Sequence, residues 1–311
     1  MTKNAVDNRV GQPRLKHRAE YAVVRRLIRS FAARPIDEAL ERGARLGRLW
    51  YTLDRGHRQL ATNNIELGLG LDRPAAAGIA RACFENIGRT IAEFALQGSR
   101  SDELLERVDL EGTGHLQAAL AQGRGAFILA GHCGNWELLA ARISRDIPVT
   151  GLARAMANPL VNTLIDTQRR AAGVRTLDAR DSAREVLRVL RHGEAVGVLL
   201  DQSALRRERV FVPFLGRPAA TNFGLAMLAL RSGAPVLPTF SARGADGRHR
   251  AWIGPPIPAA ETGDRAARIG VSTARYTAAI GDYVRRYPEQ WFWVHDRWKR
   301  TPDPGEPVWQ P

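Results

Sequence analysis

The spacing of apolar residues changes near residue 106 and divides the chain into two parts. Before this point apolar residues recur every three or four positions, which is typical of amphipathic helices. This spacing predicts three helices, at about 17–34, 36–60 and 74–98. Cys83 falls on the apolar side of the third helix and is expected to be a core thiol. Residues 2–16 are polar and charged and are expected to form a disordered tail.

After residue 106 short apolar runs alternate with helical patterns, which is typical of βαβ units and a parallel sheet. The expected strands are Val108–Leu110, Ala126–Ala130, Val149–Leu152, Val174–Leu177, Ala195–Leu200, Val210–Val212 and Pro235–Phe240, with Arg248–Ile253 as an edge strand. The expected helices cover 114–122, 135–145, 158–172, 182–192, 223–232 and 264–286. We therefore expect an α/β fold with a mostly parallel central sheet flanked by helices. Residues 1–105 form a helical N-terminal region and residues 106–311 form the α/β core.

The composition excludes several classes of protein. With 44% hydrophobic residues, the 311-residue chain is able to bury a sizeable core. Two cysteines build no disulfide framework, and the first 20 residues hold no apolar stretch of a secretory signal. No apolar run approaches the roughly 18 residues that cross a bilayer. A secreted disulfide scaffold and a membrane-spanning protein are not expected.

Positive charge is concentrated at the N-terminal end. The chain carries 46 Lys and Arg against 32 Asp and Glu, and residues 1–60 hold 14 against 6. This excess favours an anionic partner. The first predicted helix has an apolar stripe beside four arginines, Arg18, Arg25, Arg26 and Arg29. Such a helix binds an anionic membrane surface or packs on the core of its own protein, and the pattern leaves both open. We expect residues 1–105 to make peripheral membrane contact.

The first candidate for chemistry follows the strand Ala126–Ala130, because ligands bind beyond the carboxyl ends of parallel strands. The chain continues as Gly131-His132-Cys133-Gly134-Asn135-Trp136-Glu137. Chance alone predicts about 0.7 His residues with an acid five positions later, so the spacing of His132 and Glu137 does not indicate a site by itself. A site is indicated by their position at the end of a strand, where glycines flank His132. A carboxylate that orients an imidazole leaves the other ring nitrogen as a base. We expect Glu137 to orient His132, and the amides of Gly134 and Asn135 to stabilise an oxyanion.

Further candidates follow two other strands. Asp201 ends the apolar run that begins at Ala195. We expect it to contact substrate, and the alternative is that it caps a helix or turn. Arg154 follows the strand Val149–Leu152, and a basic loop later in the chain adds Arg206, Arg207 and Arg209. Guanidinium groups match phosphate oxygens, so these arginines are expected to bind phosphate. The alternative is a solvated basic loop. The spacing of His and Cys fits no zinc pattern, so no metal is expected. No cofactor is expected either.

These segments, in this order, resemble the late acyltransferases of bacterial lipid A biosynthesis, within the glycerophospholipid acyltransferase superfamily. The resemblance covers about residues 15–300 and is carried by the segments 131–137, Arg154 with 158–160, 197–202, 210–221, 226–229, 233–238 and 288–299. It implies transfer of a fatty acyl group from an acyl-carrier-protein or CoA thioester to a lipid-linked hydroxyl. It also implies that His132 and Glu137 are the catalytic pair. Many family members carry an apolar N-terminal anchor where this chain has a basic segment.

The expected mechanism is direct transfer, with His132 as general base, on a lipid A precursor or related glycolipid. Residues 106–311 are then the acyltransferase core, at the cytoplasmic face of the bacterial inner membrane. Another lipid or a natural product is the alternative acceptor. A thioester on Cys133 is a rival mechanism, although Cys133 has no base of its own. A non-catalytic protein that binds anionic lipid or nucleic acid is the alternative from another class. No nucleic-acid-binding motif is present, so no nucleic-acid partner is expected.

Overall fold

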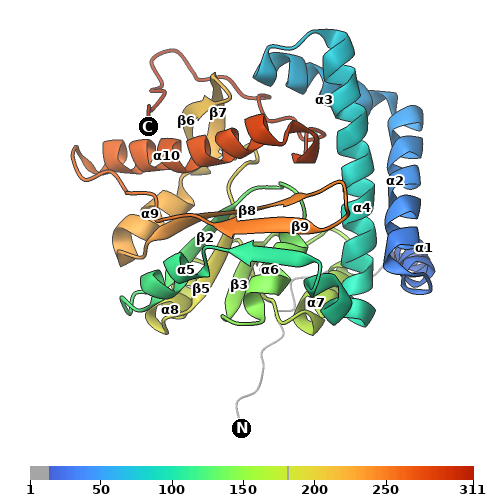
Figure 1. Ribbon diagram of the computed structural model, residues 1–311. Coiled ribbons are helices and arrows are strands. Elements are labelled where there is room, and N and C mark those ends of the chain that lie inside the picture. Colours follow the sequence, from blue (N-terminus) through green and yellow to red (C-terminus); the bar gives the residue numbers. More distant parts are fainter. Residues whose placement is uncertain (1–13, 181) are drawn as a thin grey trace.

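The N-terminal region is built from four helices. A computed structural model describes residues 14–180 and 182–311 (Figure 1). The helices are α1 (Leu15–Ala32), α2 (Ile36–Leu53), α3 (Arg55–Leu69) and α4 (Arg73–Leu105). The expected helix at 36–60 is therefore two helices, because Asp54 interrupts it and its side chain accepts a hydrogen bond from the His57 amide. Of the expected tail, residues 1–13 lie outside the described residues, whereas α1 already begins at Leu15.

The long helix α4 joins this region to the rest of the molecule. It stands beside the sheet with α2 on its outer side (Figure 1). The two helices approach closely at Gly88, where a Cβ atom would lie 2.0 Å from the carbonyl oxygen of Gly43. Phe31 of α1 and Leu40 of α2 belong to the same apolar cluster as Leu96 of α4 and Ile128 of the sheet. The helical region and the α/β part thus share one core.

A seven-stranded sheet forms the centre of the α/β part. Its strands are β1 (Val108–Glu111), β2 (Ala126–Ala130), β3 (Val149–Ala153), β4 (Arg175–Asp178), β5 (Ala195–Leu199), β8 (Val236–Arg243) and β9 (His249–Ile253). They lie in the order β1-β9-β8-β2-β5-β3-β4, and every neighbouring pair is parallel except β8 and β9. The expected mostly parallel sheet is confirmed. The prediction that β9 is an edge strand is wrong, because β1 pairs along its outer side.

The helices of the α/β part follow the expected positions closely. They are α5 (Thr113–Leu120), α6 (Trp136–Ser144), α7 (Pro159–Ala171), α8 (Ala183–Arg191), α9 (Gly224–Ser232) and α10 (Arg265–Arg286), with two short 3-10 turns, η1 (Arg206–Glu208) and η2 (Pro288–Gln290). Among the described residues, none of the helices is both long and apolar enough to cross a membrane.

A two-stranded hairpin lies outside the main sheet. Its strands are β6 (Arg209–Phe214) and β7 (Arg217–Asn222), and the second was not expected from the sequence. Leu215 and Gly216 form the turn, both with positive φ, as tight hairpin turns require. The strand β7 was missed because its Pro218 and two alanines lack the β-branched and aromatic side chains that mark strands.

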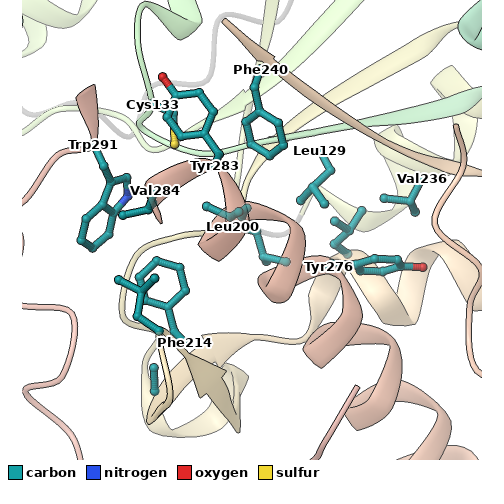
Figure 2. Packing of buried hydrophobic residues seen from close by; sticks show 14 of the residues in the cluster. Leu129, Cys133, Leu200, Phe214, Val236, Phe240, Tyr276, Tyr283, Val284 and Trp291 are labelled. Carbon is teal, nitrogen blue, oxygen red and sulfur yellow. The ribbon is translucent and has the colours of Figure 1, made fainter. Parts of the chain in front are cut away.

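Side chains alternate between the two faces of the sheet and bury both. Phe127 and Leu129 of β2 join a cluster of buried residues from α8, α9 and α10 that is rich in aromatic side chains. Figure 2 shows Leu129 in this cluster. Ala126 and Ile128 point to the opposite face, which α4, α5 and α6 cover. This double burial explains why the strands appear in the sequence as nearly continuous apolar runs.

Candidate active site

His132 and Asp201 meet at the carboxyl edge of the sheet. His132 follows β2 and Asp201 follows β5, and these strands are parallel neighbours. The Nδ1 atom of His132 lies 2.8 Å from Oδ1 of Asp201. The backbone N–H of His132 also donates to Oδ2, at 2.8 Å. Two bonds to one carboxylate fix both the ring and the backbone of His132.

The environment of Asp201 keeps its carboxylate ionised. The side chain is 1% exposed, and the indole N–H of Trp291 donates to Oδ2 at 2.8 Å. Burial alone would raise the pKa of Asp201, but attraction to His132 and the hydrogen bonds from His132 and Trp291 lower it to about 2. The sequence led us to expect substrate contact from Asp201. The structure instead buries it behind His132, so it acts on the imidazole.

Glu137 has a different partner from the one expected. Its two carboxylate oxygens accept hydrogen bonds from Nε and Nη2 of Arg169, at 2.9 and 2.5 Å. Burial would lower the pKa of Arg169, but its hydrogen bond and ion pair with Glu137 outweigh burial and raise it. Asp201, not Glu137, is therefore the carboxylate bonded to His132. The helix α6 begins at Trp136, and its first turn places Glu137 beside α7 and Arg169.

The second ring nitrogen of His132 faces the accessible side of the site. A carboxylate on Nδ1 favours the tautomer with its hydrogen there, which leaves Nε2 with a free electron pair. This nitrogen lies 3.4 Å from Nε2 of Gln202. The rings of Trp136 and Phe292 pack around the imidazole, with centroids 4.9 and 5.9 Å away. His132 is thus arranged to accept a proton at Nε2.

Two cavities meet at this histidine. The first, the sheet cavity, has a volume of about 640 Å³ and extends between the carboxyl halves of β3 and β5 and the helices α6, α7 and α9. The second, the helix cavity, measures about 460 Å³ and lies between α1 and α4. Both are lined mainly by apolar side chains. The residues common to both linings are His132, Trp136, Glu137, Met156, Ile165 and Arg169.

The sequence matches a known family over almost its whole length. The model of the family described as bacterial lipid A biosynthesis acyltransferase matches residues 11–300. The chain belongs to this family. Its members include the lipid A biosynthesis lauroyltransferase of Escherichia coli, 29% identical over 228 residues that cover 71% of each chain. The phosphatidylinositol mannoside acyltransferase of Mycobacterium tuberculosis is 29% identical over 293 residues, 89% of this chain and 87% of that protein. The protein is accordingly an acyltransferase.

The four arginines expected at the acyltransferase site do not converge there. Arg154 lines the sheet cavity, with its side chain 58% exposed and 3.6 Å from Glu208. Arg206 and Arg207 extend into solvent from η1. Arg209, whose side chain is 8% exposed, pairs with Asp303 and Glu306 of the C-terminal segment. The sequence places all four near one sheet edge, but of the four only Arg154 lines either of the two cavities described above.

Of the two expected oxyanion amides, that of Gly134 is engaged elsewhere, and Asn135 is buried. The N–H of Gly134 donates to the carbonyl of Gln290 at 2.8 Å, so it is not directed at a substrate. Asn135 is fully buried, and its side chain caps α6 by accepting from the Leu138 amide. The Asn135 side chain also donates to Glu93 at 2.6 Å. These two residues hold the loop that carries His132.

The two cysteines are core thiols. Cys83 is 1% exposed, as its place on the helix predicted, and burial raises its pKa to about 12. Cys133 is 2% exposed and points into the aromatic cluster beside Tyr283 (Figure 2). Burial and the charge of Asp201 raise the pKa of Cys133 well above its usual value. A Cys133 thiolate is therefore strongly disfavoured.

Two contributors to the site were not found from the sequence. Trp291 lies in the C-terminal segment that carries the resemblance, and no feature of that segment marks a hydrogen bond to Asp201. Arg169 lies on the helix α7 in an ordinary run of polar residues. No spacing links it to Glu137, 32 positions earlier, so the sequence holds no signal for this pair.

Proposed function

We propose that the protein transfers a fatty acyl group from an acyl-carrier-protein or CoA thioester to a hydroxyl of a lipid A precursor or related glycolipid. One observation carries this proposal: a histidine held by a buried carboxylate stands where two apolar cavities meet. A reaction between a fatty thioester and a lipid brings two hydrocarbon chains to one base. The family membership and the names of the related proteins support the same reaction.

In the proposed mechanism, Nε2 of His132 takes the proton from the acceptor hydroxyl as its oxygen attacks the thioester carbon. The tetrahedral intermediate then collapses, the carbon–sulfur bond breaks, and the imidazolium returns the proton to the leaving thiolate. Asp201 stays ionised and stabilises the imidazolium. A base of this kind typically contributes about 10²–10⁴ in rate. Cys133 forms no acyl intermediate in this mechanism.

The remaining groups around His132 have supporting roles in this proposal. Glu137, held by Arg169, contacts the substrates where the cavities join. The sheet cavity takes the acyl chain of the donor, and Arg154 at its border binds a phosphate of the donor arm or of the acceptor. The helix cavity takes a chain of the acceptor. Both volumes fall within the range of about 300–1,000 Å³ that is typical of ligand sites.

We further propose that residues 1–105 bind the membrane peripherally, at the cytoplasmic face of the inner membrane. Arg18, Arg25, Arg26 and Arg29 are exposed on α1. The apolar side of the same helix, including Val24, lines the helix cavity. Each basic residue near an anionic surface contributes about 1 kcal/mol. This arrangement holds the cavity close to the lipid that fills it.

Mass spectrometry of lipid products tests the proposal. Purified protein is incubated with a bacterial membrane lipid extract and one acyl donor, either palmitoyl-CoA or palmitoyl-acyl-carrier-protein. The acylated lipid product is then identified. H132A is expected to reduce product formation by at least about 10². H115A, which removes an exposed histidine on α5, is the matched control and keeps activity. Wild-type activity in H132A would refute the mechanism.

The same assay separates the two candidate acceptors. The similarity to the mycobacterial phosphatidylinositol mannoside acyltransferase spans more of the chain than the similarity to the Escherichia coli lauroyltransferase. An inositol-containing glycolipid is therefore the second candidate acceptor. Lipid A precursors and phosphatidylinositol mannosides are supplied in parallel reactions, and the acceptor that gains the acyl mass identifies the function.

A further inference from the structure

Two glycines lie side by side in the interior of the sheet. Gly151 of β3 pairs in register with Gly197 of β5, and β5 itself lies between β2 and β3. Interior strands of parallel sheets usually carry Val, Ile or Leu, because helices bury both faces. Glycine in such a strand weakens it and leaves no side chain to pack. This pair therefore needs an explanation other than the stability of the sheet.

A Cβ atom would fit at either glycine without a clash. A Cβ atom built on Gly197 would have its nearest neighbours at 3.8 Å, and one on Gly151 at 3.9 Å. Both glycines line the sheet cavity, together with Ile128 of β2 and Leu139 of α6. Ile128 pairs in register with Gly197 and shares its face of the sheet. The missing side chains thus widen an apolar channel between the sheet and α6.

The position of the pair fixes its distance from the reacting centre. His132 is four residues beyond Ile128, so the glycines lie at most about 13 Å from it along the strand direction, at about 3.3 Å per residue. An extended hydrocarbon with bonds of about 1.5 Å advances about 1.3 Å per carbon. Gly197 also lies one strand spacing of about 4.8 Å to the side of β2, and Gly151 lies two. A chain whose carboxyl carbon lies at His132 therefore reaches the glycine pair at about its eleventh to thirteenth carbon.

We propose that the acyl chain of the donor lies across Gly151 and Gly197, and that this pair determines the longest chain the enzyme accepts. The inference rests on the proposed function, which assigns the sheet cavity to the donor. A side chain at either position would fill the channel near these carbons. Chains of sixteen carbons would then be excluded, and chains of eight carbons would still fit.

Equilibrium binding to variants tests this proposal without requiring turnover. G197V and G151V add a side chain to the channel, and G114V adds the same side chain at an exposed position on α5 with open space around it. Calorimetry measures the affinity of acyl-CoA with eight, twelve and sixteen carbons below the micellar concentration. Alkyl glucosides of the same lengths serve as probes for an acceptor chain. Circular dichroism checks that each variant is folded.

The expected result is a cut-off in chain length that is confined to the donor series. Each methylene kept out of an apolar cavity costs about fourfold in affinity, so sixteen-carbon acyl-CoA should bind G197V at least about 100-fold more weakly. Eight-carbon acyl-CoA and all ligands of G114V should bind as to wild type. The proposal would be overturned if G197V and G151V lost affinity equally for all chain lengths, or lost none. A chain-length cut-off seen with the alkyl glucosides alone would overturn it as well. A protein that binds donors but transfers nothing would refute only the proposed function.

Discussion

Replacing Asp201 by Asn is the sharpest test of how His132 is activated. The carboxylate accepts three hydrogen bonds, two from His132 and one from Trp291. An amide of the same shape turns its NH₂ group or its oxygen toward Nδ1. Where the NH₂ group faces Nδ1, the imidazole hydrogen moves to Nε2, and the base is lost. The pKa shift from 3.8 to about 2 corresponds to about 2 kcal/mol in favour of the charged form.

We expect D201N to lower kcat by about 10³–10⁴ with little change in KM, as when the orienting carboxylate of a catalytic histidine is replaced. Steady-state transfer from an acyl thioester measures this split. E137Q is the comparison, because it changes a carboxylate that contacts Arg169 and not His132. If D201N keeps more than a tenth of kcat while E137Q abolishes transfer, Glu137 is the partner of the base in solution and our reading of the geometry fails.

The effect of D201N on the free energy of unfolding should depend on pH in a predictable way. The folded-state pKa of Asp201 lies below its usual value, so its ionised form stabilises the fold fully above about pH 4. This contribution is lost as the pH falls through about 2, when the folded protein also binds the proton. Urea unfolding of wild type and D201N should therefore differ most near neutral pH and converge in acid. A difference that grows on acidification would contradict the assigned shift.

Three further outcomes follow from the site and from the charge of the chain. High salt or carbonate should release the protein from anionic vesicles, because surface attraction is screened over about 8–10 Å; retention after both washes would refute peripheral binding. R154A should raise KM for a phosphate-bearing substrate about tenfold, whereas R206A, outside both cavities, should not; equal kinetics for the two would remove Arg154 from the site. C133A should keep most activity, and intact-protein mass spectrometry with donor alone should show no acyl adduct; an inactive C133A variant with an adduct on the wild type would indicate a ping-pong mechanism.

Local chemistry made most of the fold predictable from the sequence. The apolar run Ala126–Ala130 is a strand with the expected ends, because a fully buried strand has polar or glycine residues on both sides. The predictions of secondary structure are wrong where a single side chain or a distant segment determines the local structure. Asp54 divides one helical pattern into α2 and α3 by capping the second helix. The strand β7 exists because the turn at Leu215 and Gly216 folds it back on β6, although its own residues have low strand propensity.

In the candidate site, too, neighbouring residues along the chain predict some features, and contacts between distant segments determine the others. His132 was predictable because glycines flank it at the end of a strand, which is a local property. Its carboxylate partner was not predictable, because two acids were available, one five positions away and one 69 positions away. The nearer acid is satisfied by Arg169, which no spacing connects to it. Which acid bonds to the histidine depends on the order of the strands.

That order gives a physical reason for the use of Asp201. A residue in the first turn of α6 is carried away from the sheet by the helix, so Glu137 faces the cavities and a cation on α7. A residue that directly follows β5 stays at the sheet edge, one strand spacing from the end of β2, and is buried there. Burial makes a carboxylate effective as an orienting group, because water does not compete for its oxygens. The acid on the neighbouring strand is shielded from water and fixed in place, whereas the acid on the helix lines the cavities and is paired with Arg169.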